Sequence, residues 1–156
     1  MNFKSNFDFY CYLWFSAKYS EPDQLYNVLI SNKRIWFKEI FLRRQVLAVL
    51  PKIYPEKPKS TITLINELSN KGPDDVTSVG ITLLKLLNIE KYPKGMNLYL
   101  FPKEKHKIYP LAKFLHLLTI LSSEKFSDKI ISKKILYHIN DEWYLFWIKK
   151  FFPELI

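Results

Sequence analysis

Apolar residues recur along most of the chain with the spacing of amphipathic helices. The opening segment carries eight aromatic side chains, and neither a helical nor a strand period fits them cleanly; we favour a helix over residues 6–19. Ser20 can cap the next helix, which is predicted to run to about Ser31. A third helix is predicted over residues 33–50, because Pro51 should stop it.

Two further helical patterns lie in the middle of the chain, on either side of a turn that contains Gly72. Their apolar positions are Ile62, Leu64, Ile65 and Leu68 in the first pattern, and Val76, Val79, Leu83, Leu84, Leu86, Leu87 and Ile89 in the second. The β-branched residues 61–63 leave a strand as an alternative for the first pattern. Gly80 leaves another alternative, in which a turn divides the second pattern into helices over 73–79 and 81–89.

A basic hairpin is predicted near residues 96–109, after these two patterns. Two short segments, 96–101 and 106–109, flank a turn that starts at Pro102 and is rich in lysine. Two helices followed by such a hairpin form the outline of a winged helix-turn-helix. The predicted fold is therefore mostly α, a multi-helix domain with one short β-hairpin, and a winged helix-turn-helix-like central part is a hypothesis within it.

Three helices are predicted in the last third of the chain. The first two cover about 110–122 and 127–139, and each has an apolar stripe. The last is capped by Asn140 and stopped by Pro153, with acidic residues in its first turn and lysines in its last. These charges complement the helix dipole at both ends.

The clearest internal boundary is the segment 51–59, which has three prolines in nine residues. This composition predicts an extended linker. It divides the chain into an aromatic and basic helical part, 1–50, and a helical part with the hairpin, 60–156. The alternative is that both parts pack as a single domain.

The composition is that of a chain able to form a real core, since 48% of its 156 residues are apolar. Only 3 residues are glycine, which argues against a β-rich fold. The single cysteine, Cys11, excludes an internal disulfide and a cysteine zinc cluster. It fits the cytoplasm or another reducing compartment. No apolar run is long enough to span a bilayer, so we expect no transmembrane segment.

The net charge of +9 is concentrated in two stretches of the chain. Residues 31–59 hold eight Lys or Arg against two Glu, and residues 91–113 hold six Lys against one Glu. Concentrated positive charge attracts phosphate backbones or anionic lipid. The alternative interpretation is that the charge serves solubility.

The first basic stretch places its charges on one arc of the helix predicted over 33–50. That arc holds Lys33, Arg34, Lys38 and Arg44, with Phe37 and Phe41 among them. Basic residues interleaved with aromatic rings are typical of a helix that binds phosphate, stacks on bases or lies on a membrane surface. In the alternative, the long basic side chains only surround two core rings.

The second basic stretch places charge at the hairpin tip, at Lys103, Lys105 and Lys107. The helix before it is too apolar to recognise bases, which favours contacts with the nucleic-acid backbone.

No arrangement of residues indicates an enzyme. His106, His116 and His138 have no spacing typical of metal ligands, and no phosphate-binding loop or nuclease Asp/Glu-x-Lys motif occurs. We therefore expect no catalytic residue, cofactor or metal. A small ribonuclease that uses His106 beside Lys105 and Lys107 is the remaining enzymatic hypothesis.

The expected function is that of a non-enzymatic basic accessory protein. It would bind DNA or RNA mainly through the phosphate backbone, as a subunit of a larger nucleoprotein assembly. The alternative is a protein–protein adaptor that docks through its aromatic N-terminal helix and its last helix. In both cases a protein partner is expected.

Overall fold

The computed structural model describes residues 3–72, 74–87, 89, 114 and 142–155. Within these residues every regular element is a helix and no strand is present. The predicted hairpin near 96–109 and nearly all of the helices predicted over 110–122 and 127–139 lie outside the described residues. The mostly α fold class is confirmed for the part of the chain that the structure describes.

The first two helices match the sequence prediction closely. Helix α1 spans Asn6–Tyr19, and its N-cap residue Ser5 accepts a hydrogen bond from the backbone amide of Asp8 at 3.1 Å. Helix α2 spans Pro22–Ser31. Its N-cap is Glu21 rather than Ser20, because Pro22 occupies the first helical position.

The single helix predicted over 33–50 is wrong, since the structure has two helices there. Helix α3 spans Lys33–Trp36 and helix α4 spans Ile40–Ile53. The indole of Trp36 is fully buried and donates to the carbonyl of Leu29 at 2.8 Å, and Glu39 is extended. The gain in free energy from burying this large ring against the end of α2 outweighs the cost of interrupting the helix.

Pro51 does not stop α4, which continues to Ile53. The proline lies in the last turn, where the loss of one backbone donor leaves the turns before it intact. Helix α5 then spans Pro58–Leu68, with Pro58 at its first position. The segment 51–59 is therefore largely helical or turn rather than an extended linker. The strand considered for 61–63 is also wrong, because these residues lie in α5.

Helix α6 spans Asp75–Leu86 and runs through Gly80 without a break. The turn considered at Gly80 is therefore wrong, and the connection between the two central helices lies between Leu68 and Asp75, as the first interpretation has it. Gly72 has a φ of 155°, a conformation that side chains with a Cβ rarely adopt. The hydroxyl of Thr77 donates to the Gly72 carbonyl and so ties the turn to α6.

The last helix is confirmed as α9, Glu142–Phe151, followed by a short 3-10 turn, η2, Pro153–Leu155. Its buried residues are Tyr144, Trp147 and Ile148.

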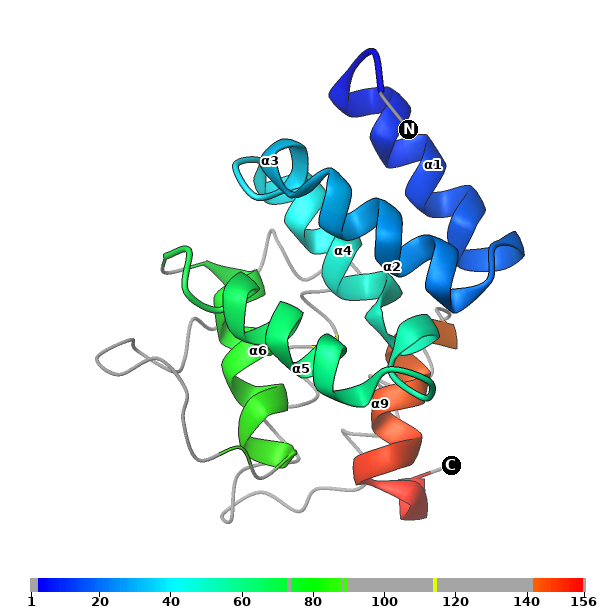
Figure 1. Ribbon diagram of the computed structural model, residues 1–156. Coiled ribbons are helices and arrows are strands. Elements are labelled where there is room, and N and C mark those ends of the chain that lie inside the picture. The colour runs from blue at the N-terminus through cyan, green and yellow to red at the C-terminus, as the bar shows by residue number, and fades with distance from the viewer. Residues whose placement is uncertain (1–2, 73, 88, 90–113, 115–141, 156) are drawn as a thin grey trace.

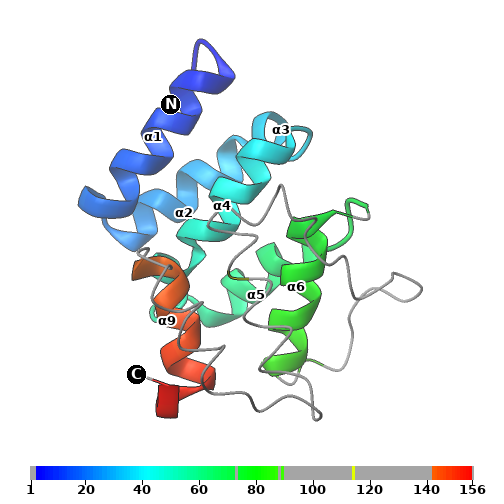
Figure 2. The ribbon, with the colours of Figure 1, turned by 180° about the vertical axis from the view of Figure 1, so that it is seen from behind.

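Helix α4 is the centre of the structure, and it contacts α1, α2, α3, α5, α6 and α9 (Figures 1 and 2). Nine of its fourteen residues are buried. Residues from α1 through α9 contribute to one hydrophobic cluster around it. A helix enclosed on nearly all sides is held by packing rather than by intrinsic propensity.

Gly80 is required because α5 and α6 approach closely at this point. A Cβ on Gly80 would lie 2.1 Å from the Ser69 Oγ and 3.3 Å from the Ser69 Cβ. That hydroxyl is fully buried and donates to the carbonyl of Ile65 at 2.7 Å. The glycine has a packing role here, which outweighs the cost of a glycine inside a helix.

We predict that Gly80→Ala lowers the free energy of unfolding by roughly 1 kcal/mol, because overpacking costs more than the improved helix propensity returns. Urea denaturation measures this. The double variant Gly80→Ala with Ser69→Ala removes the clashing hydroxyl and should be more stable than Gly80→Ala alone. A single variant as stable as the parent protein would contradict the close approach.

Candidate functional site

Two adjacent arginines of α4 pair with two adjacent aspartates at the start of α6. Arg43 Nη1 lies 2.8 Å from Asp74 Oδ2, and the Arg43 side chain is only 6% exposed. Arg44 Nε donates to both carboxylate oxygens of Asp75, at 2.9 and 3.2 Å. Asp74 also caps α6, since its Oδ1 accepts from the Thr77 amide at 2.9 Å. These contacts fix the N-terminal end of α6 against α4.

Because of this pairing and the break after α3, the basic arc predicted on one helix does not form. Arg44 faces α6 and is engaged with Asp75. Lys33, Arg34 and Lys38 lie instead on α3 and in the turn that follows it. Of the four residues predicted for this site, the structure keeps these three together and places the fourth elsewhere.

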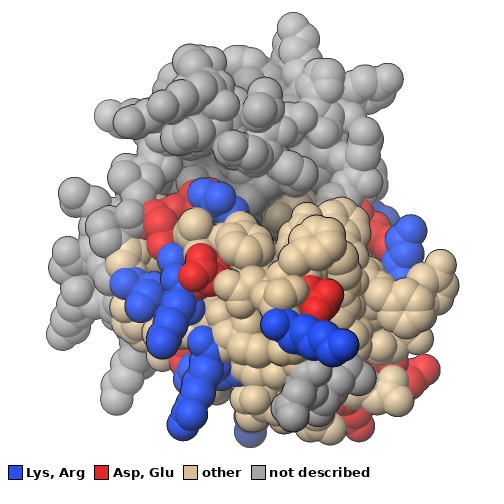
Figure 3. Space-filling model, turned by 90° about the horizontal axis from the view of Figure 1, so that it is seen from above, with Lys and Arg blue, Asp and Glu red and all other residues tan. Residues whose placement is uncertain are grey.

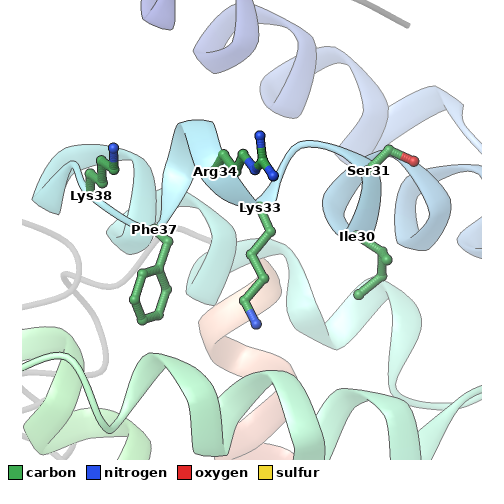
Figure 4. A pocket seen from close by; sticks show the side chains of 6 residues that line it. All are labelled: Ile30, Ser31, Lys33, Arg34, Phe37 and Lys38. Atoms are coloured by element: carbon green, nitrogen blue, oxygen red, sulfur yellow. The ribbon is translucent and has the colours of Figure 1, made fainter.

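The three remaining cations line an open hollow of about 440 Å³. Its other lining residues are Ile30, Ser31 and Phe37. In Figure 4 the side chains of Ile30, Lys33 and Phe37 extend toward α5, whereas the charged ends of Arg34 and Lys38 point to the opposite side. The hollow is therefore lined from two sides, with the Phe37 ring and Lys33 on the side of α5 and the charged ends of Arg34 and Lys38 on the other.

The charges around the hollow are only partly neutralised within the described residues. Lys33 Nζ lies 2.8 Å from Glu67 Oε2 on α5, and it also lies over the Phe37 ring at 5.8 Å from the centroid. Lys71, in the turn after α5, lies over the same ring at 5.1 Å. Arg34 and Lys38 are exposed. Figure 3 shows Lys and Arg grouped on the left of its view, the side on which Figure 1 shows α3.

Lys57, between α4 and α5, belongs to a different set of contacts. Its amino group lies 3.0 Å from Asp23 Oδ1 and over the Tyr26 ring at 5.3 Å. The hydrogen bond to Asp23 and the charge of that carboxylate raise the pKa of Lys57 above its ordinary value. This lysine is thus held in an ion pair with α2, away from the group around Phe37.

The other predicted site residues, Lys103, Lys105 and Lys107, lie outside the described residues, as do all three histidines. Within the described part of the chain, no group of three His, Cys, Asp or Glu side chains is placed to hold a metal ion. None of the helices described is long and apolar enough to cross a membrane.

Sequence reasoning missed Lys71 and the way α1 presents its aromatic residues. Lys71 follows the end of α5, far from Phe37 in sequence, and only the fold brings its amino group over that ring. On α1, four large rings are exposed although the opposite side of the helix is buried. The only sign of these exposed rings in the sequence was the irregular spacing of the aromatic residues near the N-terminus.

Comparisons with protein-family models, with curated proteins and with solved structures find no match to this chain.

We predict that Arg43→Ala lowers the free energy of unfolding by about 3 kcal/mol, because it leaves Asp74 without its partner at a largely buried position. Arg44→Ala should cost less than about 1 kcal/mol, because that pair is more exposed to solvent. Chemical denaturation of both variants measures the difference.

Asp74→Asn is the matched control for this pair. Asparagine keeps the cap on α6 but removes the charge that faces Arg43. The loss should therefore be close to that of Arg43→Ala. If Arg44→Ala proved as costly as Arg43→Ala, the assignment of the buried pair as the dominant contact would be wrong.

Proposed function

We propose that this protein is a non-enzymatic accessory protein that binds nucleic acid mainly through the phosphate backbone, with the hollow beside α3 as a contact site. The observation that carries the proposal is the grouping of Lys33, Arg34 and Lys38 around an open hollow with the Phe37 ring in its wall. Cations beside an aromatic ring suit a nucleic-acid strand, which presents phosphates and flat bases in alternation.

The distribution of ion pairs supports a contact site on α3 and in the turn that follows it. Four of the eight basic residues between positions 31 and 59 are engaged with carboxylates. These are Lys33, Arg43, Arg44 and Lys57. Arg34 and Lys38 are exposed at the hollow, and Arg34 has the planar fork that can grip a phosphate with two hydrogen bonds.

We expect the protein to bind nucleic acid with little preference for its sequence. Long cationic side chains at a rim contact phosphates, which carry no sequence information, and a ring in the wall can stack on any base. The lysines of the predicted hairpin tip, Lys103, Lys105 and Lys107, remain a second proposed contact site of the same chemistry. This kind of binding positions a protein on a strand without selecting a sequence. It therefore supports a role as a subunit of a nucleoprotein assembly.

We predict that the protein binds short DNA or RNA with an affinity that falls steeply as salt rises. Arg34→Ala with Lys38→Ala should reduce the slope of log affinity against log salt by about 1.5 to 2, since two phosphate contacts are lost. Fluorescence anisotropy with a labelled oligonucleotide measures both quantities.

The control for this experiment removes two exposed lysines elsewhere, Lys59 on α5 and Lys149 on α9. It has the same net charge as the test variant, so it should keep a slope closer to that of the parent protein. No binding at low salt would overturn the proposed function. Equal losses in the two double variants would overturn the site, and stronger binding to anionic vesicles than to the oligonucleotide would indicate a lipid surface instead.

We further predict that Phe37→Leu weakens binding of single strands by about tenfold while changing duplex binding much less. Leucine preserves an apolar wall but cannot stack on a base, and only an unpaired base exposes its face. Parallel titrations with a single strand and its duplex measure the ratio. Equal effects on both substrates would mean that the ring does not contact bases.

A further inference from the structure

Helix α1 has aromatic residues on two opposite sides. One side packs into the core through the fully buried Phe9 and Leu13. On the other side Phe7, Trp14, Phe15 and Tyr19 are 69%, 50%, 60% and 70% exposed. We call these four residues the outer face of α1.

The outer face is continuous rather than scattered. Phe7 and Trp14 are seven residues apart and Phe15 and Tyr19 are four apart, spacings that bring residues to one side of a helix, and the last two rings lie 4.9 Å apart. Tyr10 joins this face to α4, because its ring lies 6.3 Å from both Trp14 and Phe41. Figures 1 and 2 show α1 at one edge of the helical assembly, with α2 and α4 on its inner side.

A helix that has apolar residues on both sides is usually buried on both sides. Contiguous exposed rings of this size mark interaction surfaces in most proteins. They also explain why no single period fitted the N-terminal sequence: two apolar faces are superimposed on one helix.

We infer that the partner on the outer face is a second copy of this chain, with the two α1 helices packed antiparallel about a two-fold axis. Charge complementarity supports this partner. Asp8 lies in the first turn of α1 and Lys18 in the last, and both are exposed. Neither has an ion-pair partner among the described residues. Reversing a second copy brings each Asp8 opposite the other copy's Lys18.

A second pair of charges fits the same register. When residue 8 of one copy faces residue 18 of the other, Lys4, which precedes α1, comes within one residue of facing Glu21, which follows α1. Both side chains are exposed. The same register places Phe7 beside Tyr19 of the other copy and Phe15 near the axis. Antiparallel alignment also sets the helix dipoles in a favourable orientation. A two-fold interface requires such self-complementarity, since the same surface meets itself.

The expected dimer is weak. Four half-exposed rings with their neighbours bury roughly 400–600 Å² on each partner, below the roughly 800 Å² of a standard interface. We therefore expect a dissociation constant on the order of micromolar or above. The measurement must accordingly span a wide range of protein concentration.

The test is sedimentation equilibrium of the full chain and three charge variants: Asp8→Lys, Lys18→Asp, and the two combined. Each single exchange places like charges opposite each other twice in the dimer. Each should therefore raise the dissociation constant about tenfold. The double exchange restores opposite charges and should restore the dimer. This rescue distinguishes a second copy from any other partner, because only a self-associating face contains both exchanged charges.

Cys11 provides an independent measure, because it is exposed, is the single cysteine and lies on α1 close to the two-fold axis. In this register the two Cys11 positions are about 5–6 Å apart along the helix axis. A short bismaleimide should cross-link the parent protein and the double variant efficiently, and each single variant poorly. Circular dichroism confirms that α1 folds in all of them.

A parent protein that stays monomeric at every concentration would overturn the inference. A dimer whose dissociation constant is unchanged by the single exchanges, or not restored by the double exchange, would also overturn it. Binding of the monomer to lipid vesicles that is weakened by Trp14→Ala would assign the outer face to a membrane surface instead. Arg34 and Lys38 are unchanged in all variants, so nucleic-acid binding is tested separately.

Discussion

The pairing of Arg43 and Arg44 with Asp74 and Asp75 is the constraint on which the arrangement of the helices depends. A buried guanidinium is tolerated only beside an opposite charge, so the largely buried Arg43 requires Asp74 at this place. That requirement sets the N-terminal end of α6 against the N-terminal part of α4. It also fixes where α6 begins, because Asp74 is at once the partner of Arg43 and the cap of the helix. The basic side chains available for binding are those that these ion pairs leave exposed.

Much of the helical framework was predictable from local signals. The start of α2 at Pro22 and the charges at the two ends of α9 are local signals, which act within a few residues. The break after Trp36 was not predictable, because it depends on burial of that ring against α2. The alternative of a turn at Gly80 was wrong for a similar reason, since the role of this glycine depends on Ser69 at the end of another helix.

The candidate site was predictable only in part. Lys33, Arg34 and Lys38 are close in sequence, so they stay together even though the helix assumed for them ends early. Arg44 was assigned to the same arc by an ideal helix that the chain does not form. Its true partner, Asp75, is thirty-one residues away in sequence, and a helical wheel contains no information about such contacts.

The two proposed surfaces differ in chemistry and lie on different helices. The hollow beside α3 is cationic with a ring in its wall, whereas the outer face of α1 is aromatic with one charge near each end. A protein with both can hold a strand and a second copy of itself at the same time. Weak self-association would then strengthen binding along a strand, because two linked sites engage it together.

We propose above all that nucleic acid binds at α3. The position of the bound strand on the protein can be measured directly. Nuclear magnetic resonance of the isotope-labelled protein, titrated with a short single strand, reports each contact residue by residue. Binding at α3 should shift the signals of Arg34, Phe37 and Lys38, while those of the Arg44 side chain stay unchanged in its pair with Asp75. Binding that leaves all three α3 signals unshifted would contradict it.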